Sequence, residues 1–231
     1  YLIQSKMESE KNFKIIEIPY TFPKDILNNK RFKRIGYDPK LFTSLTLERY
    51  FGYKFQLISI KENFVDSFIL EKKKKINSFF KIEDKVVGEK VASKINRLHK
   101  ILRKKGSSNI FISAPENVAW LLNIRGNDNP NSPIPNSRLI LDKYKNIFFF
   151  CDLKKIKNIR KKIKYKKIKF LNFNQFFDVV SNLDQKNFAI DKLTCSVYFQ
   201  SLIESRFYIN LYEDPIYHLK SIKNKIEIQN M

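Results

Sequence analysis

The sequence predicts an α/β fold with a mixed β-sheet, and three observations support this prediction. Apolar residues alternate between short strand-like runs and stretches with helical spacing along the whole chain. Gly, Pro, Asn and Asp fall between these runs, where turns are expected. The 231 residues are 43% hydrophobic and 14% aromatic, which is enough to bury a core. We expect one partial α/β unit followed by a complete one.

Residues 1–70 predict the partial unit. Arg34–Asp38 and Lys54–Ile60 have the composition of strands, and Asp38-Pro39 ends the first of them. Thr43–Phe51 has helical spacing and ends at Gly52, a residue suited to a helix C-terminus. The remaining expectations here are a strand, a loop marked by Pro19 and Pro23, and a short helix: Phe13–Ile18, residues 19–23 and Phe64–Ile69.

Residues 71–87 predict a linker, because Glu71–Lys85 is rich in lysine and lacks a clear period. The complete unit follows at 88–213. Its expected helices are Glu89–Lys105, Glu116–Leu122, Leu153–Ile163, Gln175–Leu183 and Ser196–Arg206. Its expected strands are Asn109–Ser113, Arg138–Leu141, Asn146–Cys151, Lys167–Leu171, Phe188–Asp191 and Tyr208–Tyr212. A last helix starts at Pro215 with Asp214 as its cap, and we expect it to continue to the end of the chain.

The net charge of +22 raises the question of nucleic-acid binding. Lysine supplies 36 of the 45 basic residues, whereas base readout and bidentate phosphate contacts favour arginine. Lys, Ile, Asn and Phe are all abundant and share A- and T-rich codons, so a biased genome accounts for the lysine. The densest run, Lys154–Lys169, carries ten positive charges and no acid, and we interpret it as a solvated helix face and turn. We therefore expect no nucleic-acid partner, and no apolar run is long enough for a membrane span.

Few residues offer catalytic chemistry. His99 and His218 are the only histidines and lie far apart, so we expect neither to bind a metal. Cys151 and Cys195 lie in apolar contexts, which favours buried free thiols in a reducing cytoplasm, although a disulfide stays open. Five glycines are too few for a phosphate-binding loop, and no nucleophile motif is present. The sequence predicts no catalytic residue.

One segment stands out. Residues 119–130 place the only tryptophan, Trp120, directly before a polar loop that contains Arg125, Asn127 and Asp128 and is stiffened by prolines. From the residues alone, core packing followed by a plain connection is the favoured explanation of this pattern. The alternative is a functional loop, in which Arg125 and Asp128 hold each other or the terminus of a ligand.

The same segment carries a family resemblance. Glu116–Asp128, which reads ENVAWLLNIRGND, with Pro130, Pro133, Pro135 and a following strand, resembles the second domain of three-domain Xaa-Pro aminopeptidases (aminopeptidase P). Four flanking segments resemble the same family at the matching places: Tyr1–Lys6, Arg34–Thr43, Asn63–Asp66 and Asp214–Ile228. The chain begins without Met and stops within a predicted helix, so we expect both ends to be cut.

The resemblance implies two creatinase-like, ribonuclease H-like domains, one partial and one complete. Residues 1–70 would end the first, 71–87 would link them, 88–213 would form the second, and 214–231 would open a pita-bread catalytic domain. The family uses two divalent metal ions, usually Mn²⁺, to cleave before a proline at position two. Their ligands would lie beyond Met231, so these residues alone would be inactive and hold no cofactor.

The resemblance also implies partners and a role. These are peptides with an Xaa-Pro N-terminus and, for the whole enzyme, a second copy of itself in the cytoplasm. Trp120, Arg125, Asn127 and Asp128 would then face the substrate channel, where an Arg–Asp pair could order the loop. Two alternatives stay open, a catalytically dead binding module and a basic nucleic-acid binder, whose affinity would fall steeply with salt.

Overall fold

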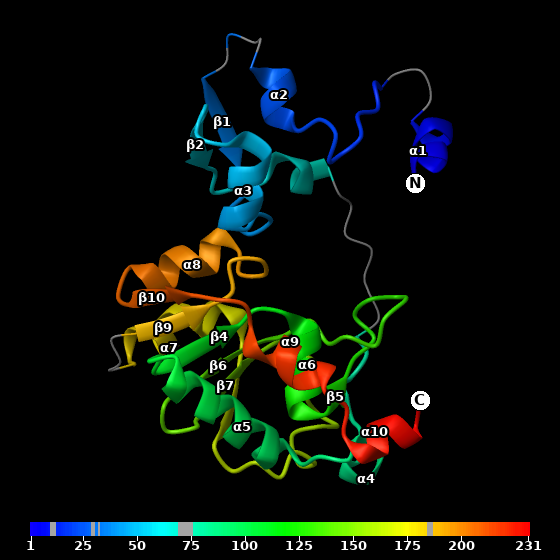
Figure 1. Ribbon diagram of the computed structural model, residues 1–231, viewed down its shortest axis with the longest axis vertical. Coiled ribbons are helices and arrows are strands. Elements are labelled where there is room, and N and C mark those ends of the chain that lie inside the picture. Colours follow the sequence, from blue (N-terminus) through cyan, green and yellow to red (C-terminus); the bar gives the residue numbers. More distant parts are fainter. Residues whose placement is uncertain (10–12, 29–30, 32, 69–75, 184–186) are drawn as a thin grey trace.

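The computed structural model describes residues 1–9, 13–28, 31, 33–68, 76–183 and 187–231. Two structured parts are visible in Figure 1, a small one in blue and cyan and a larger one in green to red. The small part contains helices α1 (Leu2–Glu8), α2 (Pro23–Leu27) and α3 (Ser44–Phe51), strands β1 (Arg34–Tyr37) and β2 (Gln56–Ser59), and a 3₁₀ helix at Phe64–Phe68.

In the small part, β1, α3 and β2 form a βαβ unit with parallel strands. The Thr43 hydroxyl accepts from Thr46 N at the start of α3, and Gly52 ends that helix with a φ of 58°. Both strands, the helix and its cap were predicted. The predicted strand Phe13–Ile18 is wrong: it pairs with no described strand and is mostly exposed. The expected loop between Pro19 and Pro23 instead ends in α2, because Pro23 occupies its first turn.

The larger part contains a six-stranded mixed sheet in the order β10-β9-β4-β6-β7-β8. The strands are β4 (Asn109–Ile112), β6 (Arg138–Leu141), β7 (Ile147–Phe150), β8 (Ile168–Leu171), β9 (Asn187–Ile190) and β10 (Tyr208–Leu211). Strands β6 and β7 form the predicted antiparallel hairpin, and β4 pairs with β6 in the same sense. The pairs β10–β9, β4–β9 and β7–β8 are parallel.

Helices cover both faces of this sheet. They are α5 (Val91–Lys104), α6 (Pro115–Leu122), α7 (Phe176–Ser181), α8 (Val197–Glu204) and α9 (Pro215–Ser221). Ile110 and Ile112 point into the core with α5, α6 and α9, whereas Phe111 between them packs with α7 and α8. This alternation is the period of two that a strand imposes. The result is a three-layer α/β/α unit, which confirms the predicted α/β fold with a mixed sheet.

Two expected elements differ in this unit. Leu153–Ile163 is a 3₁₀ turn at Leu153–Lys155 followed by further turns, although the predicted face, Ile156, Ile159 and Ile163, is buried. Like charges three and four residues apart, such as Lys157 and Lys161, oppose a continuous helix here. The last helix breaks after Ser221, because Asn224 caps a separate helix, α10 (Lys225–Gln229).

The predicted linker, 71–87, differs as well. Residues 71–75 lie outside the described residues. From Phe79 on, the linker prediction is wrong: Phe79 is fully buried, and its N–H donates to Lys155 O at 2.8 Å. Strand β3 (Phe80–Lys81) and helix α4 (Asp84–Val87) follow, and β3 pairs with the short strand β5 (Ile124–Arg125). The sequence did not predict this packing, because lysines lie between the apolar residues Phe79, Ile82 and Val86 and hide their period.

The two parts touch through backbone contacts at the start of α8. Val197 N donates to Phe42 O at 2.8 Å, and Tyr198 N donates to Pro39 O at 2.9 Å. Thr43 and Ser196 form an isolated antiparallel bridge beside them. The first N–H groups of a helix lack partners within it, so the loop after β1 supplies the acceptors.

Candidate functional site

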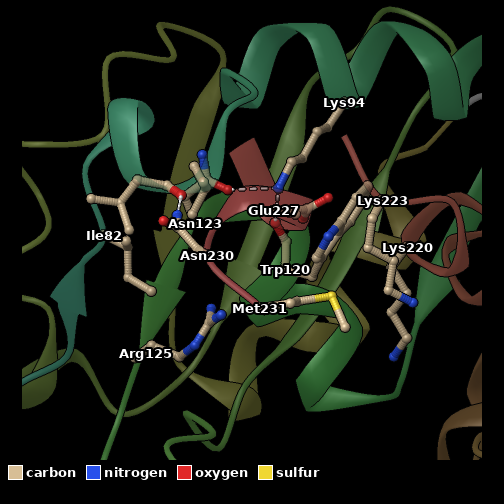
Figure 2. A pocket seen from close by; sticks show the side chains of 12 residues that line it. Ile82, Lys94, Trp120, Asn123, Arg125, Lys220, Lys223, Glu227, Asn230 and Met231 are labelled. Carbon is tan, nitrogen blue, oxygen red and sulfur yellow. Dashed lines mark hydrogen bonds between the residues drawn. The ribbon is translucent and has the colours of Figure 1, made fainter. Parts of the chain in front are cut away.

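The candidate site is a cavity of about 520 Å³ in the larger part, between α4, α5, the end of α6 and the chain after α9. Figure 2 shows Trp120 and Lys94 beside one another, with Arg125 on one side and Lys220 and Lys223 on the other. Apolar wall is supplied by Ile82, Val86, Val87 and Met231. A volume of this size is typical of small-molecule sites.

Asn123 organises the inner end of the cavity. It ends α6 in the left-handed conformation, with a φ of 54°, which asparagine tolerates better than most residues. Its side-chain Nδ2 donates to Glu89 O at 2.9 Å, and its backbone O accepts from Ile82 N at 2.8 Å. Asn123 thereby joins α6 to the segments on either side of α4.

Lys94 is almost fully buried, with 1% of its surface exposed. Its Nζ donates to Trp120 O at 2.8 Å and to Asn123 Oδ1 at 2.7 Å, and it lies 4.0 Å from the centre of the Trp120 ring. Burial lowers the pKa of the Lys94 ammonium to about 8, although Glu89 and Glu227 partly oppose the shift. Lys94 thus holds Trp120 in position through its backbone oxygen and its ring.

Arg125 contributes a second cation, which is partly buried. Its Nη1 donates to Ile124 O at 2.8 Å and to Ala119 O at 3.5 Å. Within the described part of the chain, no carboxylate forms an ion pair with it. Burial lowers the pKa of its guanidinium from the ordinary value. Nε and Nη2 have no protein acceptor among the described residues.

A buried polar network extends from the cavity to the sheet. Lys220 Nζ donates to Asn117 Oδ1 at 2.6 Å, and Asn117 Nδ2 donates to Asp214 Oδ2 at 2.8 Å. Asp214 also caps α9 by accepting from Ile216 N, and its own N–H donates to Asp191 Oδ2 at 3.0 Å. Burial raises the pKa of the Asp214 carboxyl to about 6.

The structure does not bring the four predicted site residues together in one place. Trp120 and Arg125 line the cavity, whereas Asn127 is exposed. The expected Arg125–Asp128 pair is wrong: Asp128 pairs with Lys155 and accepts from Asn136 N at 2.7 Å. The loop turns away at Gly126, where a Cβ would lie 2.8 Å from Phe79 and Pro135 atoms. Asp128 therefore closes the proline-containing loop onto the segment after β7.

Sequence reasoning missed Lys94, Lys220, Lys223 and Glu227 as members of one site. Lys94 offered a signal, because it lies three residues after Val91 and four before Leu98, on the apolar stripe of α5. A charged residue on such a stripe must find buried partners. The other three gave no signal, since they lie at the end of α9 and in the chain after it, far in sequence from α4, α5 and α6.

The residues that the structure describes do not fit a metal centre. Across the described ranges, no three His, Cys, Asp or Glu side chains gather in a way that could hold an ion. His99 is half-buried and bonds to Lys143 O at 2.8 Å, while His218 is exposed on α9. Cys151 and Cys195 are buried free thiols, as predicted. No helix in the described residues is both long and apolar enough to cross a bilayer.

Comparisons with known proteins agree with this architecture. The family described as Creatinase/Prolidase N-terminal domain matches residues 71–227. Xaa-Pro aminopeptidase 1 of Dictyostelium discoideum is 27% identical over 254 residues, which cover all of this chain and 40% of that protein. The probable Xaa-Pro aminopeptidase P of Laccaria bicolor is 26% identical over 249 residues, covering 99% of this chain and 38% of that protein.

A solved structure shares the fold. The X-prolyl aminopeptidase of Caenorhabditis elegans, described as a cytosolic enzyme with a di-nuclear active site, superposes with a TM-score of 0.77 at 23% identity. The match covers 93% of this chain and 37% of that one. The chain thus spans about two fifths of the length of these relatives. Its similarity to Xaa-Pro aminopeptidases extends along nearly all of its own length. With its mixed sheet, its two helical layers and the match over residues 71–227, the chain belongs to the creatinase/prolidase N-terminal domain family.

Proposed function

We propose that this chain is the non-catalytic N-terminal portion of an aminopeptidase that removes the first residue from peptides with proline second. The observation that carries the proposal is the similarity to Xaa-Pro aminopeptidases along the whole chain, not only in one domain. Because the chain covers about two fifths of these relatives, their remaining length leaves room for a catalytic domain.

In this proposal the metal ligands lie outside these 231 residues. Two divalent ions, with Mn²⁺ as the expected metal, would activate water in the catalytic domain. Residues 1–70 would end a first creatinase-like domain, a second would run to residue 213, and 214–231 would lead into the catalytic domain. The buried position of Phe79 favours a start of the second domain before residue 88.

The role proposed for this chain is to support a homodimer and to form one wall of the peptide channel. Two features favour that role. The small part leaves large apolar side chains exposed, such as Phe64 at 74% and Phe68 at 85%, which is typical of a covered surface. Trp120 and Arg125 combine an aromatic face with a guanidinium at one cavity. Buried free thiols and the cytosolic C. elegans neighbour favour a cytoplasmic location.

The test compares the complete gene product with the 231-residue chain. Both are assayed with Mn²⁺ on Ala-Pro-Phe and on Ala-Ala-Phe, before and after treatment with EDTA. We expect only the complete product to release alanine, only from the proline peptide, and only with metal present. Sedimentation of the complete product should show a dimer.

A complete product that binds Ala-Pro-Phe without cleaving it would contradict the peptidase proposal and favour a catalytically dead binding module. Cleavage of both peptides at equal rates would contradict the proline specificity. Activity of the 231-residue chain alone would contradict the placement of the metal centre outside it.

A further inference from the structure

The cavity at Trp120 has an excess of positive charge. Its lining includes four cationic side chains, Lys94, Arg125, Lys220 and Lys223, and one side-chain carboxylate, that of Glu227. One oxygen of Glu227, Oε2, accepts from Asn224 N at 2.9 Å in the capping box of α10, and the charge of Glu227 also acts on Lys94. None of the four cations forms an ion pair with a described carboxylate. Lys94 is buried, Arg125 and Lys220 are partly buried, and Lys223 is exposed. Cations that are buried or partly buried without counter-charges favour an anionic ligand.

The four cations differ in how free they are to bind. Lys94 directs its Nζ at two oxygens and the Trp120 ring, so it is saturated. Lys220 and Lys223 each donate to a neutral oxygen, at 2.6 Å and 3.0 Å, and keep further N–H groups. Arg125 uses only Nη1, toward backbone carbonyls. Its Nε and Nη2 form an edge that matches the two oxygens of a carboxylate.

The rest of the cavity favours an apolar group beside that anion. Ile82, Val86, Val87 and Met231 line the cavity together with the Trp120 ring. The volume of about 520 Å³ accommodates two or three amino-acid residues. A ligand with a terminal carboxylate next to an apolar side chain satisfies both halves of the lining.

We propose that this cavity binds the C-terminal end of a short peptide, with its carboxylate on Arg125 and its last side chain, an apolar one, against Trp120. The proposal rests on the peptidase function above for its choice of a peptide as ligand. The carboxylate contact itself follows from the cations and holds for any peptide that ends in an apolar residue. Proline is not part of the recognition.

The single tryptophan makes the test direct. Because Trp120 is the only tryptophan in the chain, its fluorescence reports occupancy of this cavity alone. The 231-residue chain is titrated with Gly-Pro-Leu, with its C-terminal amide, and with Gly-Ala-Leu. We expect saturable changes with both acids at similar concentrations, and at least tenfold weaker binding of the amide.

Arg125→Gln and Arg103→Gln form a matched pair, since each removes one positive charge and Arg103 is exposed on α5, outside the cavity. We expect Arg125→Gln to weaken binding of Gly-Pro-Leu at least tenfold and Arg103→Gln to change it less than twofold. Arg125→Lys should fall between them, because an ammonium cannot bind both oxygens in parallel. If Arg125→Gln does not fold, as judged by circular dichroism, the double variant Lys220→Gln/Lys223→Gln replaces it, with a threefold or greater loss expected.

Equal binding of acid and amide, absence of saturable binding, or equal effects of the two arginine variants would each overturn the proposal. The outcome is separable from that of the peptidase test. Binding by this chain together with an inactive complete product would leave the cavity assignment standing and remove the peptidase function. Cleavage by the complete product without carboxylate-dependent binding would support the peptidase function and overturn the cavity assignment.

Discussion

Asp214 is a buried carboxyl whose protonation is tied to folding. It is 4% exposed, and burial raises its pKa to about 6, above the ordinary value of 3.8. The folded protein therefore holds this proton more tightly than the unfolded chain does, so stability from this group is lost as pH rises through about 6. Asp191 adds to the shift, while Asn117 and Lys220 oppose it.

Asp214→Asn removes this titration and keeps an oxygen to cap α9. Relative to the variant, we expect the wild-type free energy of unfolding to rise by about 1 kcal/mol as pH falls from about 7 to about 5. Urea denaturation of both proteins at several pH values measures the difference. If the difference in unfolding free energy between the two proteins does not change between about pH 5 and about pH 7, the pKa of Asp214 is not raised into this range.

Asn123 combines a backbone and a side-chain role, and two substitutions separate them. Asn123→Gly keeps the left-handed conformation accessible but removes the acceptor for Lys94 and the donor for Glu89 O. Asn123→Ala loses these bonds and also strains the backbone at a φ of 54°. We expect both to destabilise the fold, the alanine variant by about 1 kcal/mol more.

Thermal unfolding followed by circular dichroism measures both Asn123 variants. Unchanged melting of Asn123→Gly would contradict the importance of the bond to Lys94. A glycine variant less stable than the alanine variant would contradict the backbone role.

Among the elements, the packing of α4 against α10 closes the cavity. Asn224 Nδ2 donates to Val87 O at 2.8 Å, and Asn230 Nδ2 donates to Val86 O at 3.1 Å. Gly88, which ends α4 with a φ of 74°, leaves room for Asn224, because a Cβ there would lie 2.3 Å from Asn224 Oδ1.

Gly88→Ala should therefore separate the two helices. Gly106 is the matched control, since its φ is 66° and nothing lies within 4 Å of an added Cβ. We expect Gly106→Ala to lower the free energy of unfolding by about 1 kcal/mol and Gly88→Ala to lower it clearly more. If chemical denaturation shows that the two variants lose equal free energy of unfolding, α10 can move away from α4 without destabilising the fold.

At the scale of the whole molecule, both core clusters belong to the larger part. Every buried member of the two clusters comes from Phe79 or later. We expect residues 76–231 expressed alone to unfold cooperatively, with a melting temperature within about 5 °C of the complete chain. The α8 contacts with Phe42 and Pro39 would be the main loss. A non-cooperative melt of this shorter chain, followed by circular dichroism, would show that the small part is required for folding.

The sequence predicted correctly the elements that local residues determine, and it missed those that depend on contacts with distant residues. Elements with a clear period, such as α5, and with defined caps, such as α3 and α9, were predicted because local residues determine them. Leu153–Ile163 had the right buried face but the wrong backbone, since apolar spacing alone does not distinguish a helix from successive turns. Phe79 was missed because its burial depends on a distant partner, Lys155 O.

The site shows the same division. Trp120 and Arg125 were singled out by their unusual local sequence, and both line the cavity. The pairing of Asp128 with Lys155 was not predictable from neighbours, since 27 positions separate the two residues. The cavity lies between α4, α6 and α10. Because these segments are far apart in the sequence, no local pattern predicts that they meet.

The order of strands in the larger sheet has a consequence for how the chain acquires its structure. The β6–β7 hairpin needs only the turn at residues 142–146, where Asp142 accepts from the N–H groups of Tyr144 and Asn146. The adjacent pair β4–β9 joins Asn109 to Phe188, 79 positions apart, and must close a large loop first. The hairpin should thus acquire protection from hydrogen exchange early during refolding, and β9 late. Until β9 docks, one edge of β4 stays open to pairing with other chains, and this interval is when the protein is most prone to aggregate.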